Sequence, residues 1–367
     1  TIDSGLQRNL DYLMSNAYSE SGAEVVTAGV MEIKTGKILA MSTYPSFNPN
    51  ERNISTFNNY FLEGTIECGS VFKPFIYADS IEEGKYDHNA YYNSGSYNVY
   101  YGNKLVATIK DHNGGQGWGT ITYDQGLYHS SNVAICNLLD QGYVTKDVLT
   151  EKLNDLGFFQ GDTMDGLTCS SSINAYTRKN AGRLEYLTTG FGQGSTVTPY
   201  QLLKAYSVFG NDGKTVQPHI VDKVVNPETN KVVYQATPKY SKQIFSTNTI
   251  SQVKDLMLGV IEDEQGTGKT YRLDNDVRMI GKTGTGQVVE NGGYSTTLYM
   301  HSFVGIAPYD DPQVVMFLTF KSGDSYAQYM PNIVKQTMNE ALQVVNRYNA
   351  KNTTAVDQSC TLDSYTN

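Results

Sequence analysis

A serine and a lysine three residues apart in the stretch IECGSVFKPF, Ser70 and Lys73, could act as a nucleophile and its base. On a helix, residues i and i+3 share one face. Pro74 lacks an N–H and is tolerated only near a helix start, which predicts Ser70 at a helix N-terminus, where the dipole favours a developing negative charge. A serine hydroxyl is a weak nucleophile until a base removes its proton. Lys73 could be that base if burial and a neighbouring cation lower its pKa from about 10.4.

A second stretch, YHSSNVA, places Ser130 and Asn132 two residues apart. From a tight turn, a hydroxyl and an amide at this spacing could both face one cleft. Taken alone, these residue types more often form a helix cap or a turn. Their chemistry becomes informative only in combination with the other stretches.

A third stretch, IGKTGTGQ, contains four consecutive residues of interest: Lys282, Thr283, Gly284 and Thr285. In a strand, the lysine and the glycine would point to one face and the two threonines to the other. A glycine there would let another backbone, such as a peptide substrate, approach closely. The stretch is not a phosphate-binding loop, because that pattern requires a glycine where Asp276 stands.

The elements that must position these groups follow from hydrophobic periodicity and turn residues. A β-hairpin opens the chain, a long helical middle follows, and three strands and a final helix close it. The expected strands are 25–33, 38–42, 277–289 and two within 301–321, and the expected helices begin after Gly69 and lie within 122–142, 198–210, 247–263 and 331–348. This order predicts an antiparallel sheet whose first and last elements meet, with helices packed on it and an inserted all-helical region.

The composition is that of a folded, acidic protein, with 367 residues, 39% of them hydrophobic, and a net charge of −9. The length suits one large domain, or a large domain with a small lobe. Without a basic stripe, nucleic-acid binding is disfavoured. No apolar run approaches the ~18 residues that cross a bilayer, and no signal peptide is present. Because the chain starts at Thr1 without a methionine, we expect it to be a fragment of a longer protein.

Taken together, the three stretches are specific. In the order Ser-x-x-Lys, Ser-x-Asn, Lys-Thr-Gly they resemble the signature set of penicillin-binding proteins and the related serine β-lactamases. TIDSGLQ, KTGKILAMSTYPSFNPN, GFGQGSTVTPYQL and GKTGTGQ also resemble the transpeptidase domain of class B penicillin-binding proteins. The resemblance covers about residues 1–348 and leaves 349–367 as a polar C-terminal tail. It implies an α+β fold, a five-stranded antiparallel sheet flanked by helices with an inserted all-helical subdomain.

The resemblance implies acyl transfer on the D-Ala-D-Ala end of a peptidoglycan stem peptide, with no cofactor required. Ser70 would attack the penultimate D-Ala carbonyl and form an acyl-enzyme, which the amine of a second stem peptide resolves. β-Lactam antibiotics would acylate the same serine. Lys73 would be the base, and Ser130 would relay the proton to the leaving D-Ala nitrogen.

The remaining roles implied by the resemblance concern substrate binding and charge. Asn132 would bond the substrate's amide side chain and Lys73, and Lys282 would supply positive charge that helps keep Lys73 neutral. Thr283 and Thr285, with Gly284 between them, would bind the terminal carboxylate. The backbone N–H groups of Ser70 and Thr285 would form the oxyanion hole, typically worth ~3 kcal/mol per donor.

Two other functions fit parts of the pattern. A class A β-lactamase needs a glutamate in a Glu-x-x-Leu-Asn loop, and EKLN at 151–154 is one residue short of it. A β-lactamase or β-lactam sensor is therefore the first alternative. A degenerate family member that serves as a cell-wall binding or scaffold module is the second, although all three motifs are intact.

One departure from the family lies beside the nucleophile. Cys68 stands where the family usually has proline, Asp111 and His112 precede the Ser-x-Asn stretch, and Cys136 follows it. If these side chains converge, with His129 as a substitute for His112, they would suit a tetrahedral zinc ion that pins the active-site loops. Two buried free thiols or a Cys68–Cys136 disulfide would also account for the cysteines, and the sequence leaves all three arrangements open.

The resemblance also implies the surroundings of the domain. Family habit places it at the extracytoplasmic face of the bacterial cell membrane, held by an N-terminal anchor and a pedestal domain outside this fragment. It further implies a glycosyltransferase partner within a cell-wall synthesis complex.

Overall fold

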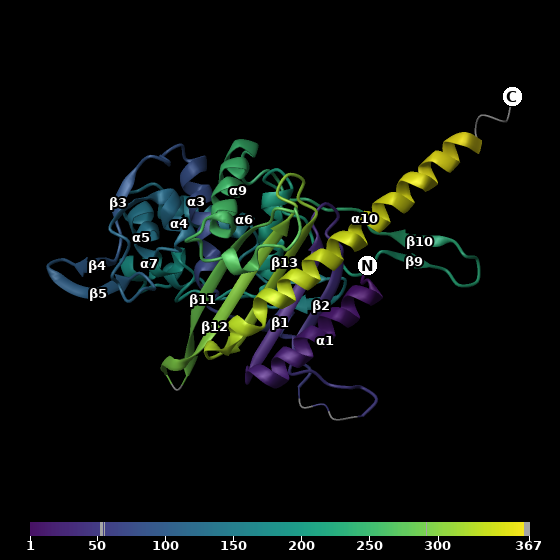
Figure 1. The fold of residues 1–367 in the computed structure, drawn as a ribbon, viewed down its shortest axis with the longest axis horizontal. Coiled ribbons are helices and arrows are strands. Elements are labelled where there is room, and N and C mark those ends of the chain that lie inside the picture. Colours follow the sequence, from purple (N-terminus) through teal and green to yellow (C-terminus); the bar gives the residue numbers. More distant parts are fainter. Residues whose placement is uncertain (52–53, 55, 291, 363–367) are drawn as a thin grey trace.

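The computed structural model describes residues 1–51, 54, 56–290 and 292–362 of the chain. Its centre is an antiparallel sheet of five strands in the order β11-β12-β13-β1-β2 (Figure 1). These strands are β1 (Val25–Glu32), β2 (Ile38–Tyr44), β11 (Ile280–Glu290), β12 (Gly293–Ala307) and β13 (Val314–Ser322). Because β1 pairs with both β2 and β13, the two ends of the chain meet inside the sheet. The predicted five-stranded antiparallel sheet is confirmed.

Helices cover both faces of this sheet, because successive side chains of its strands point to opposite sides. In β13, Met316 and Leu318 belong to one apolar core, whereas Val315 and Phe317 belong to the other. The first core lies under α1 (Ser4–Ser21) and α10 (Met330–Leu362), which run along one face in Figure 1. The second core includes residues of α3 (Lys73–Glu82), α8 (Pro199–Tyr206) and α9 (Thr247–Glu262). The candidate site is built on this second side.

The helix ends follow their capping residues. In α1, the Asp3 side chain accepts hydrogen bonds from the N–H groups of Gly5 and Leu6, and Gly22 ends the helix with a φ of +68°. In α8, Thr198 and Gln201 form a capping box around a first-turn proline, as the Thr-Pro pair predicts.

The region between α3 and α8 contains short helices and three small two-stranded sheets joined by loops. Its helices are α4 (Tyr123–Tyr128), α5 (Asn132–Asp140), α6 (Lys146–Asp155), α7 (Arg183–Gly190) and the 3₁₀ turn η2 (Ala175–Thr177). Its strand pairs are β3 (Tyr91–Asn93) with β6 (Thr120–Thr122), β4 (Ser96–Tyr101) with β5 (Lys104–Lys110), and β7 (Asp162–Met164) with β8 (Leu167–Cys169). The subdomain is therefore less purely helical than predicted, because tyrosines and β-branched residues around the turn at Gly102 favour a hairpin.

The remaining elements are short. They are α2 (Tyr60–Glu63), the hairpin β9 (Lys223–Val225) and β10 (Val232–Gln235), and the 3₁₀ turns η1 (Gly69–Phe72), η3 (Ser207–Gly210), η4 (Lys269–Tyr271) and η5 (Asp324–Gln328).

The last helix is longer than predicted. We expected it to end at Tyr348, and α10 continues to Leu362, so most of the predicted polar tail has a helical backbone. Residues 349–362 contain neither glycine nor proline, so nothing in their composition stops a helix. The rest of that tail, 363–367, lies outside the described residues. Within the described chain, no helix combines the length and hydropathy needed to span a bilayer.

Candidate active site

Ser70 and Lys73 lie where a 3₁₀ turn runs into a helix. Ser70 belongs to η1, and Lys73 is the first residue of α3, followed by Pro74 in the first helical turn. Ser70 is half-buried and lines a large cavity, whereas Lys73 is fully buried. The candidate nucleophile is thus open to the cavity, and its candidate base is enclosed by protein.

Both lysines of the motifs bind Ser130. Lys73 Nζ donates a hydrogen bond to the Ser130 carbonyl oxygen at 2.5 Å and lies 3.4 Å from its Oγ. Lys282 Nζ donates to Ser130 Oγ at 2.8 Å and to the carbonyl oxygen of Thr283 at 2.9 Å. Ser130 has a φ of +58°, a conformation that costs a non-glycine residue on the order of 1–3 kcal/mol. The three sequence stretches therefore meet at one strained serine.

The electrostatics of this junction favour unprotonated amines. Burial lowers the pKa of Lys73 to about 7, although the negative charge of Asp111 opposes that shift. Burial also lowers the pKa of Lys282 well below its usual value, and the charge of Lys73 lowers it further. Two amines this close titrate as a pair, because a proton on either disfavours a proton on the other. The positive charge predicted for Lys282 is therefore better described as one proton shared between Lys73 and Lys282.

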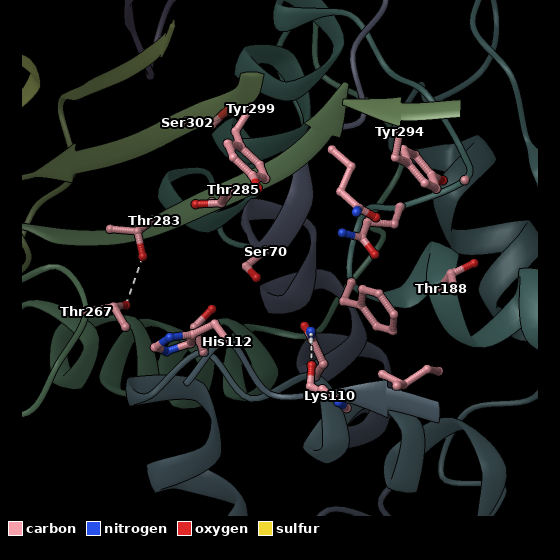
Figure 2. A pocket seen from close by; sticks show the side chains of 18 of the residues that line it. Ser70, Lys110, His112, Thr188, Thr267, Thr283, Thr285, Tyr294, Tyr299 and Ser302 are labelled. Carbon is pink, nitrogen blue, oxygen red and sulfur yellow. Dashed lines mark hydrogen bonds between the residues drawn. The ribbon is translucent and has the colours of Figure 1, made fainter. Parts of the chain in front are cut away.

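The Lys-Thr-Gly stretch lies on β11, an edge strand of the sheet. Its side chains alternate as predicted: Lys282 and Gly284 are buried, Thr283 is half-buried and Thr285 is exposed. Figure 2 shows Thr283 and Thr285 on one strand facing the space around Ser70. Thr283 Oγ1 donates to Thr267 Oγ1 at 2.8 Å, so this hydroxyl is held in place.

The glycines of β11 admit a backbone of the protein itself. A Cβ on Gly284 would lie 2.7 Å from the carbonyl oxygen of Cys68, and one on Gly286 would lie 1.7 Å from that of Glu67. The contact is close on the η1 segment as well. Gly69 has a φ of +64°, and a Cβ there would lie 2.4 Å from the carbonyl oxygen of Thr285 on β11. We expected Gly284 to let another backbone, such as a peptide substrate, approach closely. A backbone does approach, and it is the segment of the protein that carries Ser70.

A cavity of about 1020 Å³ opens over these groups. Residues of all three motifs line it: Ser70, Ser130, Asn132, Thr283, Gly284 and Thr285. The β4–β5 hairpin, α7 and the segment 193–194 contribute other walls. The cavity is large enough for an extended peptide of several residues, since drug-sized ligands occupy about 300–1,000 Å³.

Two predicted contacts are absent from the described structure. The Ser70 side chain makes no hydrogen bond to Lys73, whose Nζ donates to the Ser130 carbonyl oxygen instead. The Asn132 amide donates to the carbonyl oxygen of Lys110 at 2.9 Å rather than meeting Lys73. Catalytic hydrogen bonds are often long without substrate and tighten when it binds.

Comparison with known proteins identifies the family. Residues 26–343 match the family described as the penicillin-binding protein transpeptidase domain. The chain belongs to this family.

The names of similar proteins are consistent with membership of this family. The chain is 30% identical to stage V sporulation protein D of Bacillus subtilis over 90% of its own length and 50% of that protein. It is 26% identical to a probable peptidoglycan D,D-transpeptidase, PenA, of Neisseria flavescens, over 90% of this chain and 77% of that protein. The chain spans about half the length of the first of these relatives.

Solved structures of transpeptidase domains share the fold. The domain from penicillin-binding protein 3 of Burkholderia pseudomallei matches with a TM-score of 0.77 at 23% identity, over 94% of this chain and 96% of that one. Penicillin-binding protein 2X of Streptococcus thermophilus matches with a TM-score of 0.82 at 24% identity, over 93% of this chain and 51% of that one.

The predicted zinc site is not supported in this transpeptidase domain. Among the described residues, no group of three or more His, Cys, Asp or Glu side chains could hold a metal ion. Both oxygens of Asp111 accept hydrogen bonds from backbone N–H groups. His112 Nε2 lies 2.9 Å from the carbonyl oxygen of His129, so this ring nitrogen has a partner within the protein. These local partners take up the polar atoms that a metal would need.

The cysteines whose side chains the structure describes are free, buried thiols. Cys68, Cys136 and Cys169 are all unpaired and buried, which excludes the Cys68–Cys136 disulfide in this structure. Burial raises the pKa of the Cys68 and Cys136 thiols, so both are inert as nucleophiles. Of the three arrangements that the sequence leaves open, free thiols agree with the structure.

Sequence reasoning missed the support behind the nucleophile. The carbonyl oxygen of Gly192 accepts a hydrogen bond from the N–H of Gly69 at 3.0 Å, and a Cβ on Gly192 would lie 2.1 Å from the Gly69 oxygen. The Tyr206 hydroxyl of α8 donates to the carbonyl oxygen of Val71. The glycines of GFGQG were a signal for such close contact, because Gly192 and Gly194 both have positive φ.

Proposed function

We propose that the protein is a peptidoglycan D,D-transpeptidase, in which Ser70 carries the acyl group from one stem peptide to the amine of another. The observation that supports this most directly is that Lys73 and Lys282 both bind Ser130 beside the cavity that Ser70 lines. A neutral amine, a relay hydroxyl and an accessible nucleophile are what acyl transfer requires. The D,D-transpeptidase name carried by a relative points to the same reaction.

In the first half-reaction, Ser70 Oγ attacks the penultimate D-Ala carbonyl carbon and passes its proton to Lys73. With a pKa of about 7, a substantial fraction of Lys73 is neutral and able to accept it. The tetrahedral oxyanion is bound by the backbone N–H groups of Ser70 and Thr285. Its collapse breaks the C–N bond, and the departing D-Ala nitrogen takes a proton from Ser130 Oγ, which the lysine pair restores.

In the second half-reaction, the amine of another stem peptide attacks the Ser70 ester. It loses a proton along the same path in reverse, and the new amide leaves as Ser70 regains its hydroxyl. Thr283 and Thr285, which line the cavity beside Ser70, are the proposed site for the donor's terminal carboxylate.

The described cavity walls lack the water-activating glutamate of a class A β-lactamase. Of the described residues that line it, Glu185 is the one carboxylate, and its Oε2 accepts the Gly182 N–H at 2.7 Å as part of the cap of α7. Glu151, from the EKLN stretch, is exposed on α6 and is not among the lining residues. A class A β-lactamase activates water with a glutamate, and the described walls of this cavity offer no free carboxylate for that role.

Intact-mass measurement after treatment with benzylpenicillin tests the proposal. We expect one adduct of the full penicillin mass, mapped to the peptide that contains Ser70, and none in Ser70→Ala. Nitrocefin should acylate the protein without sustained turnover. An unchanged mass contradicts the proposal, and rapid nitrocefin turnover would make the protein a β-lactamase instead.

We further propose the setting that the reaction requires. Its polymeric substrate lies outside the membrane, so the full-length protein would be held at the extracytoplasmic face by an N-terminal anchor and would work beside a glycosyltransferase of the cell-wall synthesis complex. Labelling of intact cells with a membrane-impermeant fluorescent penicillin, followed by fractionation, should recover the full-length protein in the membrane fraction. Label confined to the soluble fraction contradicts this placement.

A further inference from the structure

Asp111 is a buried carboxylate at the junction between a hairpin and the Ser130 turn. It directly follows β5, and only 2% of its surface is exposed. It is not among the residues that line the cavity, so substrate would not touch it. A buried carboxylate is costly unless its oxygens are paired, so its partners show what it is for.

Those partners are on both sides of the junction. Oδ1 accepts from the hydroxyl of Ser131 at 2.9 Å and from the N–H groups of Asn132 at 2.7 Å and Val133 at 3.1 Å. Oδ2 accepts from the N–H of Gly95 at 2.8 Å, just before β4. One carboxylate therefore fastens the start of α5 to the hairpin that forms a wall of the cavity.

Ser131, which Asp111 holds in this way, comes directly after the strained residue Ser130. Ser130 holds its positive φ with its carbonyl and hydroxyl oxygens on two different lysines. A turn under strain persists only when its surroundings determine it. The bonds from Asp111 hold residues 131–133, immediately beyond the strained turn, and so keep Ser130 facing the lysines.

Asp111 also contributes charge. Its hydrogen-bond donors are three backbone N–H groups and one hydroxyl, so none of them brings a positive charge. Its field reaches the lysine, since the charge of Asp111 raises the pKa of Lys73 against the effect of burial. The other groups that interact with Lys73 are Lys282 on β11, Cys136 on α5 and His112 after β5.

We propose that Asp111 is a positioning residue with two effects: it holds Ser130 in its strained conformation, and it fixes a buried negative charge beside Ser131, the residue next to the Ser130 carbonyl oxygen that accepts the hydrogen bond of Lys73. The proposal rests on the proposed function, because it assumes that Lys73 takes the proton from Ser70. This role differs from that of an ordinary helix cap, which would stabilise α5 without affecting the chemistry of Lys73.

The test is the second-order rate constant for acylation of Ser70 by a fluorescent penicillin, measured from pH 5 to 9. Asp111→Asn removes the charge but keeps the size and one acceptor oxygen. We expect the midpoint of its acid limb to fall by about one pH unit, because loss of a nearby negative charge favours the neutral amine. Asp111→Glu keeps the charge and misplaces it, and we expect an unchanged midpoint with a plateau rate lowered about tenfold or more.

Asp3→Asn is the matched control, because Asp3 also accepts two backbone N–H groups at a helix start, at 3.0 Å each, but caps α1. It should change thermal stability alone. An Asp111→Asn midpoint equal to that of wild type refutes the effect of charge. If Asp111→Asn does not fold, Asp111→Glu decides, and a plateau rate equal to wild type overturns the positioning role. If wild-type Ser70 is not acylated at all, the proposed function fails rather than this inference.

Discussion

Acylation of Ser70 should depend on pH through the neutral fraction of Lys73. Burial lowers the pKa of this amine from 10.5 to about 7, a difference of about 3.5. At pH 7 an ordinary lysine would be neutral in roughly one molecule in three thousand, whereas Lys73 would be neutral in about half. The fold therefore supplies roughly a thousandfold more of the reactive form at neutral pH.

The perturbation is acidification, and its size follows from the same value. At pH 5, two units below a pKa of about 7, roughly 1% of Lys73 is neutral. We expect the second-order acylation rate constant to fall about tenfold per pH unit below the midpoint and to level off above about pH 8. This rate constant reports groups of the free enzyme, so the limb belongs to the protein before penicillin binds.

Stopped-flow fluorescence with a labelled penicillin, at constant ionic strength, measures the profile, and circular dichroism at each pH confirms that the protein stays folded. Lys282→Met provides the internal comparison. It removes a group whose proton opposes that of Lys73, so the midpoint should stay or rise, opposite in sign to the fall expected for Asp111→Asn. A rate constant that is flat from pH 8 to pH 5, or a midpoint near 10, refutes the assignment of Lys73 as the buried base.

Three further predictions concern stability and metal content. Because the pKa of Lys73 is lowered in the folded state, the unfolded state binds more protons between about pH 7 and 10.5, and stability attributable to this residue rises with pH across that window. Lys73→Met should therefore abolish acylation yet raise the Tm near pH 7, by an advantage that shrinks towards pH 10 in calorimetry; a Tm difference constant with pH contradicts this. Gly286→Ala should lower stability by about 1–3 kcal/mol in urea unfolding and slow acylation, because its Cβ would lie 1.7 Å from the Glu67 carbonyl oxygen. Gly293→Ala, which meets nothing within 4 Å, should do neither, and equal losses in both variants would refute the role of close approach. Purified protein should contain no stoichiometric zinc by plasma mass spectrometry and should keep its Tm in EDTA. A Tm that EDTA lowers and added zinc restores would instead indicate a structural metal site.

The sequence predicted the parts of the site that depend on local period and motif order. Alternation along β11 placed Lys282 and the two threonines on opposite faces, and Pro74 placed Ser70 near a helix start. Both inferences need only the geometry of one element. The family resemblance then indicated that the three motifs meet, and the hydrogen bonds from Lys73 and Lys282 to Ser130 show where they do so.

Other features depended on contacts between distant segments, which no local pattern contains. Gly284 was expected to let another backbone approach, and the carbonyl oxygen that approaches it belongs to Cys68. Asp111 was a candidate zinc ligand in one of three arrangements left open, and it accepts hydrogen bonds from two segments that lie on either side of it in sequence. The sequence singled out both Gly284 and Asp111. The groups that contact them became evident only from the positions of the turn η1 and the hairpin β4–β5.

The arrangement at Ser130 explains why such a site needs a large fold around a small amount of chemistry. The burial that lowers the pKa of Lys73 to about 7 opposes protonation of the amine, and it is unfavourable to folding in proportion to the pKa shift. The strained φ of Ser130 adds a second unfavourable contribution. Two extensive apolar cores on either side of the sheet offset these contributions. The proposed reactive state of Ser70 would thus be maintained by packing on both faces of the sheet, including residues of α1 and α10 that lie on the face opposite the site.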